Sequence, residues 1–443
     1  MQNFFTPKSI AVIGVSKNPK KVGSIILSNL LQSYKKKIIP INPKQKKIQG
    51  QKAYSSVLDY KGKIDLAVIA VPAQFVIQVI EQCGKKGIKN VIIVSSGFRE
   101  IGNERLEHEL YKSLEKNKIK CIGPNCLGVY DAHSGLDSLF LPISQMKRPK
   151  AGNISFISQS GALGSALVDL AAYEDFGFAK FVSYGNATNL GETELLEYLS
   201  KDKQTKIICM YIEAIKNGKK FMKVAKQTKK PIIVIKGGRS EKGSKATVSH
   251  TGSLAGSYEV YKGAFKQSNV IIVDSLAEMF HVAKLFDKLS TPKGKRVQVI
   301  TNGGGYGIIT TDAIEENQIP LADLSSKTTK RLTALFPKIC SINNPMDLVG
   351  DATNERYRIA IDACMRDPKI DILLIILLPQ TPLISKSVIK ELVKFQNKKP
   401  MAFIVTGGER TKPFVKEMEK HNLAVFQYPS EAVKALKKFI SWF

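Results

Sequence analysis

The sequence lacks the long apolar runs of a membrane protein. None of its uninterrupted hydrophobic segments is long enough to cross a bilayer, so we expect no membrane association. The first residues, Met1 to Phe5, carry no basic stretch followed by an apolar one, and we therefore expect no signal peptide. Both absences argue against a secreted or membrane-anchored protein.

Cysteine is scarce and scattered. Of the six cysteines, Cys121 and Cys126 form the only close pair, and no second pair follows to complete a metal site. We predict no metal bound by this chain's own residues. We also expect reduced thiols, which are typical of a cytoplasmic protein.

Acidic residues are few beside basic ones. The chain has 67 lysines and arginines against 38 aspartates and glutamates, a formal net charge of +29. The lysines are spread along the chain, with no basic tail and no interleaved aromatic residues of the kind that stack on bases. We therefore predict no nucleic-acid binding. A lysine-rich proteome or a more acidic partner subunit would explain the charge.

What the sequence does contain is a regular alternation of apolar strands and amphipathic helices. Strand patterns lie at residues 9–15, 37–41, 66–71, 91–94 and 121–125, with helical patterns at 21–31, 74–85 and 104–115. This alternation predicts a doubly wound parallel α/β sheet, whose ligands bind at the carboxyl ends of the strands. The residues expected at those ends are Gly14, Asn42, Pro72, Ser95 and Gly123.

The first sheet lacks the features of an NAD site. Residues 14–18 read Gly-Val-Ser-Lys-Asn, without the G-x-G-x-x-G fingerprint. The second strand runs into Asn42, Pro43 and Lys44, where an NAD site would place an acid on the ribose. Lys44 suits a phosphorylated nucleotide instead. A sheet of this type with no ligand is the alternative.

A second sheet is expected after an irregular connector at residues 130–151. Its strands are predicted at 153–157, 178–183, 207–212, 231–235 and 270–273, and its helices at 192–199, 258–267 and 276–285. Small residues from Ser158 onward open a helix after the first of these strands, and such a helix start binds anions. The rival is a nucleophile elbow with Ser160 attacking and His250 as base, but that motif needs glycine at Ser158 and Ala162.

His250 lies among small residues in the stretch 248–257, which reads Val-Ser-His-Thr-Gly-Ser-Leu-Ala-Gly-Ser. An anionic group such as phosphate can approach an imidazole closely there, although a loop histidine beside a helix start is the alternative. Residues 238–245, just before it, approach a Walker A loop. Ser244 and Lys245 stand in swapped order and no helix is expected to start there, so we reject an ATP loop.

A linker at residues 290–295 precedes a third sheet. The strand at 296–301 runs into Asn-Gly-Gly-Gly-Tyr-Gly at 302–307 and a helix at 308–316, which predicts a second anion-binding helix start or, alternatively, a plain tight turn. Residues 344–348 are predicted to form a turn. Further strands are expected at 372–378 and 402–405, and a final helix at 430–439.

Five motifs occur together in the order of one known family. They are residues 95–100 (Ser-Ser-Gly-Phe-Arg-Glu), 123–128 (Gly-Pro-Asn-Cys-Leu-Gly), 158–164 (Ser-Gln-Ser-Gly-Ala-Leu-Gly), 249–256 (Ser-His-Thr-Gly-Ser-Leu-Ala-Gly) and 344–347 (Asn-Pro-Met-Asp). Over essentially its full length the chain resembles the α subunit of ADP-forming acetate–CoA ligase, in the NDP-forming acyl-CoA synthetase superfamily with succinyl-CoA synthetase. The resemblance implies a Rossmann-like CoA-binding domain at 1–128, a flavodoxin-like ligase domain at 129–289 that carries a phosphohistidine, and a second flavodoxin-like ligase domain at 290–443.

The resemblance also implies roles for individual residues. His250 would carry the phosphoryl group and Glu213 would orient its imidazole. The implied CoA-binding residues are Gly14, Ser16, Lys44, Val71, Pro72, Ser96 and Gly97. The implied phosphate-binding residues are Asn125, Ser158, Ser160, Gly161, Gly304 and Gly305.

The implied reaction converts acetyl-CoA or a similar acyl-CoA, ADP and phosphate into the free carboxylic acid, CoA and ATP. The chain carries no recognisable ATP-grasp region, so the resemblance implies a separate ATP-grasp β subunit, commonly in an α2β2 assembly, that holds most of the Mg²⁺ and ADP or ATP contacts. Asn189 and Gly191 stand where the family commonly has acids, and Tyr306 where proline is frequent, so docking or substrate preference would differ there. The alternative function is a non-catalytic, regulatory CoA- or acyl-CoA-binding protein of the same fold.

Overall fold

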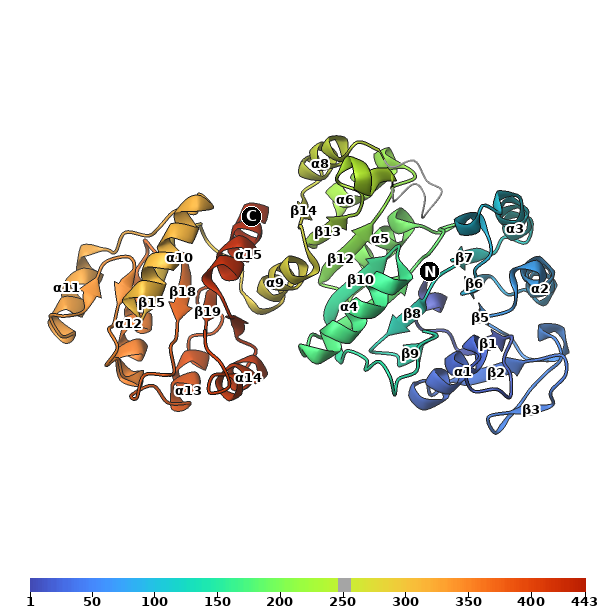
Figure 1. Cartoon of the computed structure of the whole chain (residues 1–443), viewed down its shortest axis with the longest axis horizontal. Coiled ribbons are helices and arrows are strands. Elements are labelled where there is room, and N and C mark those ends of the chain that lie inside the picture. Colours follow the sequence, from blue (N-terminus) through green and yellow to red (C-terminus); the bar gives the residue numbers. More distant parts are fainter. Residues whose placement is uncertain (246–255) are drawn as a thin grey trace. The chain divides into compact units, whose positions relative to one another are not determined.

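The computed structural model describes residues 1–245 and 256–443, and contacts divide the chain into two compact units. The first unit is Met1–Asp274 and the second is Ser275–Phe443. Figure 1 labels the elements of each unit. The three domains expected at 1–128, 129–289 and 290–443 stay a prediction.

The first sheet is wholly parallel, with strand order β2-β1-β5-β6-β7. Its strands are β1 (Ser9–Ile13), β2 (Lys37–Ile41), β5 (Leu66–Ile69), β6 (Asn90–Ile93) and β7 (Lys120–Ile122), and its helices are α1 (Val22–Ser33), α2 (Ala73–Lys86) and α3 (Glu104–Lys116). All five residues of β1 are buried, because helices cover both faces of such a sheet. A short hairpin, β3 (Lys47–Ile48) and β4 (Gln51–Lys52), follows β2.

The second sheet also belongs to the first unit, with strand order β14-β13-β12-β10-β11-β8-β9. Its strands are β8 (Gly128–Asp131), β9 (Leu136–Asp137), β10 (Ala151–Ser158), β11 (Phe178–Ser183), β12 (Ile207–Ile212), β13 (Ile232–Lys236) and β14 (Val270–Ile272). Its helices are α4 (Gly161–Tyr173), α5 (Glu192–Lys201), α6 (Gly218–Gln227) and α8 (Tyr258–Gln267). The five strands β10 to β14 are parallel, whereas β8 is antiparallel to β11 and to β9.

Two expectations for this region are wrong. The connector at residues 130–151 is not irregular throughout, because β8 and β9 pair onto the sheet; strands this short show no readable periodicity. Residues 241–245 are helical, so a helix does start after β13. The order of Ser244 and Lys245 is then the feature that distinguishes the stretch from a Walker A loop.

One hydrophobic core spans both sheets of the first unit. It contains Ile10 and Ile92 from the first sheet together with Ile157, Val182 and Met210 from the second, all with no accessible surface. Burying these side chains together stabilises each sheet against the other. The loops at the carboxyl ends of both sheets are therefore built on one packed body.

The second unit holds a third sheet of order β16-β17-β15-β18-β19-β20. Its strands are β15 (Val297–Thr301), β16 (Ser341–Ile342), β17 (Met346–Asp347), β18 (Ile372–Ile376), β19 (Met401–Ile404) and β20 (Ala424–Phe426). Its helices are α9 (Leu276–Lys288), α10 (Gly304–Glu316), α11 (Ser326–Leu335), α12 (Asn354–Arg366), α13 (Ser387–Val393), α14 (Lys412–Lys420) and α15 (Pro429–Trp442). The predicted turn at 344–348 is wrong in part, because Met346 and Asp347 pair in parallel with Ile300 and Thr301 of β15.

The three sheets share one topology. In each, the first parallel strand lies between the second and the third, which is the doubly wound order 2-1-3-4-5. The order reverses between β1 and β5, between β10 and β12, and between β15 and β18, and ligands bind beside such reversals. The predicted α/β fold of three doubly wound sheets is confirmed.

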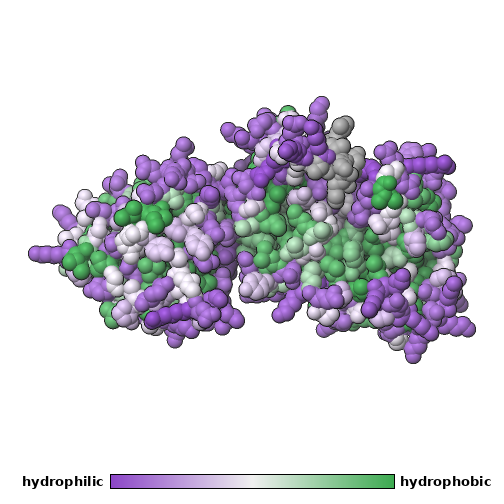
Figure 2. Space-filling view, in the orientation of Figure 1, coloured by the Kyte–Doolittle hydropathy of each residue, from purple (hydrophilic) through white to green (hydrophobic). Residues whose placement is uncertain are grey.

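Figure 2 shows one face, on which many hydrophilic residues lie along the margins and hydrophobic areas lie between them. This agrees with a lysine-rich composition in which the charges are spread rather than clustered in one segment. Among the described residues, no helix combines the length and the apolar character needed to cross a membrane.

A buried ion network ties the second sheet together at Lys180 on β11, whose side chain is about 2% exposed. Its Nζ lies 3.0 Å from Asp202 Oδ2, 3.4 Å from Asp131 Oδ2 and 2.7 Å from Gln204 Oε1. Asp131 belongs to β8, and Asp202 follows α5. The network therefore joins an antiparallel strand to the parallel core of the sheet.

Replacing this lysine tests the network. Lys180→Met leaves the buried carboxylate of Asp131 without its cation, and we expect the free energy of unfolding to fall by about 3–5 kcal/mol in urea titrations. The control is Lys201→Met, which removes an exposed ion pair with Glu197 and should cost less than about 1 kcal/mol. Equal losses in the two variants would contradict the assignment.

Candidate active site

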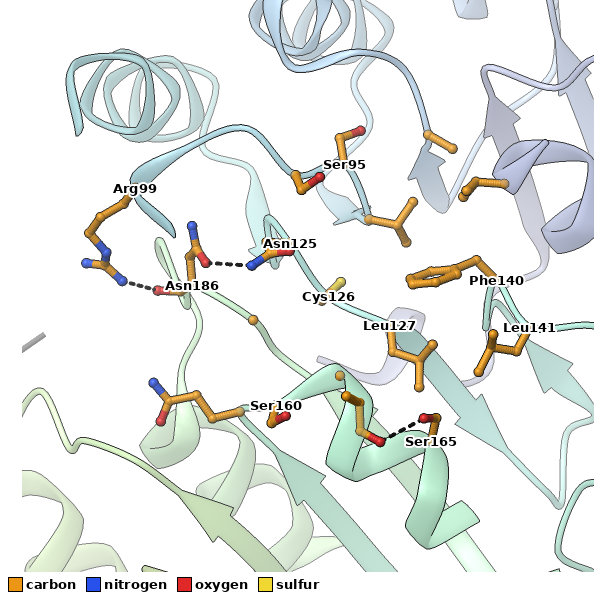
Figure 3. Close-up of a pocket in the computed structure, with 18 of the residues that line it drawn as sticks. Ser95, Arg99, Asn125, Cys126, Leu127, Phe140, Leu141, Ser160, Ser165 and Asn186 are labelled. Atoms are coloured by element: carbon orange, nitrogen blue, oxygen red, sulfur yellow. Dashed lines mark hydrogen bonds between the residues drawn. The ribbon is translucent and has the colours of Figure 1, made fainter. Parts of the chain in front are cut away.

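A cavity of about 730 Å³ lies in the first unit, where the loops after β5, β6 and β7 meet those after β10, β11 and β12. These loops come from the carboxyl ends of the first and second sheets. In Figure 3, Leu127, Phe140 and Leu141 gather on one side of it, and Arg99, Asn125 and Asn186 on the other. The cavity therefore has an apolar side and a polar side.

The cavity brings together seven of the site residues predicted from the sequence. They are Val71, Pro72, Ser96, Asn125, Ser160, Gly161 and Glu213. Residues implied for CoA and residues implied for phosphate therefore share one wall.

Other predicted residues lie outside this wall. Gly14 ends β1 with φ +94°, and an added Cβ would lie 2.3 Å from the carbonyl oxygen of Ala70. The backbone N–H of Ser16 donates to Ser24 Oγ at 3.0 Å, and the side chain of Lys44 is exposed. His250 lies outside the described residues.

The remaining predicted positions divide between the two units. Ser158 is buried at the end of β10, and its Oγ donates to the carbonyl of Ser160 at 2.6 Å. Gly97 has φ +111°. Gly304 and Gly305 open α10 in the second unit, and they are not among the residues that line this cavity.

Helix α4 begins at the cavity. Ser160 is its N-cap residue, and the Oγ of Ser160 accepts a hydrogen bond from the N–H of Leu163 at 3.3 Å. Gly161, the first residue of the helix, lines the wall. The positive end of the helix dipole thus faces a space that can hold an anion.

The loops after β7 and β11 touch through their backbones. Gly185 has φ +54°, and an added Cβ would lie 2.3 Å from the carbonyl oxygens of both Pro124 and Asn125. The N–H of Asn186 donates to the carbonyl of Pro124 at 3.0 Å, and Asn125 Nδ2 donates to Asn186 Oδ1 at 3.4 Å. Only glycine fits this approach, so Gly185 holds Asn125 and Asn186 together.

Asn186 is the centre of a polar network on the same side. Its Nδ2 donates to Glu100 Oε2 at 2.7 Å and to Glu107 Oε2 at 2.9 Å, and its carbonyl accepts from Arg99 Nη2 at 2.9 Å. Burial raises the pKa of Glu100, but hydrogen bonds from Gly97 and Asn186 outweigh it and the pKa lies below its ordinary value. Glu100 is therefore ionised at neutral pH.

Glu213 follows β12 directly and is 5% exposed. Its backbone N–H donates to Gln159 Oε1 at 2.9 Å, and the N–H of Ala214 donates to the same oxygen at 3.2 Å. Burial raises the pKa of Tyr211, and the neighbouring carboxylate of Glu213 raises it further. Glu213 is therefore a buried acid at the cavity wall with a fixed backbone.

One departure from the expected family pattern, Asn189, has a structural explanation, whereas nothing in the structure requires glycine at Gly191. Asn189 Oδ1 accepts from the N–H of Cys121 at 2.8 Å, and its Nδ2 donates to the carbonyl of Ile119 at 3.0 Å. An ionised aspartate could not donate that second bond. Gly191 is the N-cap residue of α5, and its N–H donates to Glu194 Oε2 at 3.1 Å.

The comparison with known proteins agrees with this arrangement. Family models match a CoA binding domain at residues 8–132, a succinyl-CoA ligase like flavodoxin domain at 151–286 and a ligase-CoA domain at 297–440. The chain is 40% identical over 442 residues to the α subunit of acetate–CoA ligase [ADP-forming] II from Pyrococcus furiosus, covering 98% of this chain and 95% of that protein. The chain belongs to the ADP-forming acetate–CoA ligase family. The resemblance inferred from the five motifs is confirmed.

Further members of the family extend the likeness. The dinucleotide forming acetyl-coenzyme A synthetase 1 of Ca. Korarchaeum cryptofilum, solved in complex with phosphate and ADP, has a TM-score of 0.94 and 37% identity, covering 100% of this chain and 96% of that one. Acetate–CoA ligase [ADP-forming] I of Archaeoglobus fulgidus is 37% identical over 440 residues, which are 98% of this chain and 63% of that longer protein.

Sequence reasoning misses part of this ligase-family cavity. Arg99 falls inside one of the five motifs, but nothing in the sequence pairs it with Asn186. Phe140 and Leu141 line the apolar side from within the connector that was expected to be irregular. The missing information in both cases is a contact between distant segments.

The polar network predicts the effect of removing Asn186. In Asn186→Ala the carboxylates of Glu100 and Glu107 each lose a donor, and we expect the free energy of unfolding to fall by about 1–3 kcal/mol. Amide hydrogen exchange at residues 97–103 should accelerate as well, since Glu100 loses its hydrogen bond to the second sheet, although Arg99 keeps its bond to the carbonyl of residue 186.

The matched control is Asn29→Ala. Asn29 is also buried, and its Nδ2 donates to the carbonyls of Leu139 and Leu141 at 2.8 and 3.0 Å. This variant should lose a similar amount of stability without selective acceleration at residues 97–103. The same acceleration in both variants would show that Asn186 does not hold this loop.

Proposed function

We propose that the chain is the α subunit of an ADP-forming acyl-CoA synthetase, which interconverts acetyl-CoA or a similar acyl-CoA, ADP and phosphate with the free acid, CoA and ATP. The observation that carries this proposal is the shared wall of the cavity. It joins Val71, Pro72 and Ser96 of the first sheet with Ser160 and Glu213 of the second. The names of the relatives support both the reaction and the α-subunit role.

The CoA contacts are proposed at the carboxyl ends of the first sheet. The turn after β1 provides Gly14 and Ser16, and Lys44 follows β2 with an exposed ammonium that suits a phosphate of the nucleotide. A CoA binding domain model matches this region. The thiol end of CoA would enter the cavity past Val71 and Pro72. Ser96 and Gly97, on the loop after β6, are the remaining proposed CoA contacts.

Phosphate is proposed to bind at two helix starts. The first is the start of α4, with Ser158, Ser160 and Gly161 beside Asn125. The second is the start of α10, at Gly304 and Gly305. Backbone N–H groups and the helix dipole would stabilise the transferring dianion at each station.

The proposed reaction proceeds through an acyl phosphate. Phosphate attacks the thioester carbonyl, and CoA leaves as the thiol. The imidazole of His250 then attacks the phosphorus of the acyl phosphate, and the carboxylate leaves. The carboxylate of Glu213 accepts a hydrogen bond from the other ring nitrogen's N–H, which holds the tautomer and stabilises the charged phosphohistidine. The phosphoryl group finally passes to ADP.

The nucleotide step is proposed on a partner. A separate ATP-grasp β subunit, in an α2β2 assembly, would make most of the contacts to Mg²⁺ and to ADP or ATP. Two facts support a partner subunit: the Pyrococcus relative is named as a subunit, and the chain covers 63% of the longer Archaeoglobus relative. The cytoplasmic location expected from the cysteines stays a prediction.

Phosphorylation of His250 tests the proposal. With the β subunit, Mg²⁺ and γ-labelled ATP, the chain should acquire acid-labile, base-stable phosphate that acetate plus CoA removes. His250→Ala should abolish the label, whereas the control His421→Ala, at an exposed histidine of the second unit, should keep it. An unlabelled wild-type chain that still binds CoA would favour the regulatory alternative instead.

The CoA contact at Lys44 gives a second test. Lys44→Ala removes one positive charge from a phosphate, so we expect CoA affinity measured by calorimetry to fall about 5- to 10-fold, and less at high salt. The control is Lys112→Ala, at an exposed lysine of α3. Equal affinities in both variants would remove Lys44 from the CoA site.

A further inference from the structure

Lys236 is a buried lysine at the end of β13, with 1% of its surface exposed. Its Nζ donates to the carbonyl oxygen of Glu213 at 2.7 Å and to that of Gly237 at 2.5 Å. The ammonium also lies 4.6 Å from the centroid of the Tyr261 ring. Both acceptors and the ring are neutral, and among the described residues no carboxylate forms an ion pair with this ammonium.

Burying an ammonium in such a place costs free energy. Burial lowers the pKa of Lys236, and the nearby charge of Glu213 opposes that shift. A neutral side chain of similar length could fill the same space at a lower cost. The position of the charge therefore points to a role beyond packing.

The backbone that carries Glu213 is held from three elements. Gln159, which follows β10, accepts from the N–H groups of Glu213 and Ala214. Tyr261 of α8 accepts from the N–H of Ile215 through its hydroxyl at 3.1 Å. Lys236, at the end of β13, donates to the Glu213 carbonyl. The end of β12 is thus held by side chains from three other segments.

We propose that Lys236 is a positioning residue for Glu213, holding its backbone by a hydrogen bond and its carboxylate in the ionised form by charge. The inference rests on the proposed function, in which Glu213 orients His250. Lys236 does not touch the substrates. It acts through Glu213, and its loss is felt in phosphoryl transfer rather than in CoA binding.

Among the described residues, Lys236 is the cation near Glu213. Tyr211 lies on its own strand and Tyr184 follows β11; burial and the charge of Glu213 raise the pKa of both phenols, so both are neutral at pH 7. Tyr261 of α8 accepts a hydrogen bond from the N–H of Ile215. Lys236 brings the positive charge. Removing it disfavours the ionised carboxylate, and a protonated Glu213 cannot accept the imidazole N–H. Because the charge of Glu213 raises the pKa of Lys236, the same interaction favours the ionised carboxylate, and we expect the acid limb of the pH profile to move to higher pH in the variant.

The chain offers a matched control at the opposite end of the same strand. Lys230 precedes β13, and its Nζ donates to the carbonyls of Leu199 and Asp202 at 2.7 and 2.6 Å. Burial lowers its pKa too. Lys230→Met therefore removes the same kind and number of bonds as Lys236→Met, away from Glu213.

The experiment compares both variants, assembled with the β subunit, in single-turnover phosphorylation from labelled ATP and in steady-state turnover. Lys236→Met should slow phosphorylation and kcat about 10- to 100-fold, leave KM for CoA within about 2-fold, and move the acid limb up by about 0.5–1 pH unit. Lys230→Met should keep wild-type rates and pH profile even if its Tm falls equally.

Each outcome of this comparison either supports or overturns the positioning role of Lys236. A Lys236→Met rate no lower than that of Lys230→Met, or a lower rate with an unmoved acid limb, would overturn the inference. If Lys236→Met does not fold, Lys236→Gln keeps a donor without the charge, and its acid limb should still move. Absence of phosphohistidine in the wild-type protein would instead contradict the proposed function. Failure of the Lys236 inference and failure of the proposed function are therefore distinguishable.

Discussion

The structure of the first unit depends on the close backbone approach between the loops after β7 and β11. Gly185 lies against the carbonyls of Pro124 and Asn125, at a distance that no side chain would permit. Because these loops leave different sheets, this contact and the shared hydrophobic core hold two sets of strand ends at one cavity. This approach and the shared core therefore bring loops of the CoA-binding sheet and of the ligase sheet to one cavity wall.

Buried charge is the second organising feature, and it is used in two ways. Lys180 neutralises two carboxylates away from the cavity and joins strands. Lys236 instead binds neutral carbonyls beside Glu213, while Glu100 is kept ionised by amide donors. In a low-dielectric interior, the hydrogen bonds and charges around a side chain decide whether it is ionised. Charged side chains at the cavity are the ones that can take part in a reaction there.

The repetition of one strand order in all three sheets explains how such a site is assembled. Each sheet places its reversal beside the first strand, and each places small residues after that strand, at Gly14, Ser158 and Gly303. A turn of this kind leaves N–H groups free for an anion. As proposed, the same local device serves both a nucleotide phosphate and the transferring phosphoryl group.

The sequence by itself predicted the strands of the first sheet, the five parallel strands of the second and the small-residue turns, because apolar periodicity and glycine content are local properties. Helices α6 and α11 to α14 and strand β20 were not expected from it. It also placed Val71, Pro72, Ser96, Asn125, Ser160, Gly161 and Glu213 at strand ends, which the topology then gathers at one cavity. Tertiary structure alone decided that β8 and β9 join the second sheet, that Asn186 bonds residues about 80 positions away, and that Lys236 faces Glu213. These contacts join distant segments, and no local pattern encodes which distant partner a side chain meets.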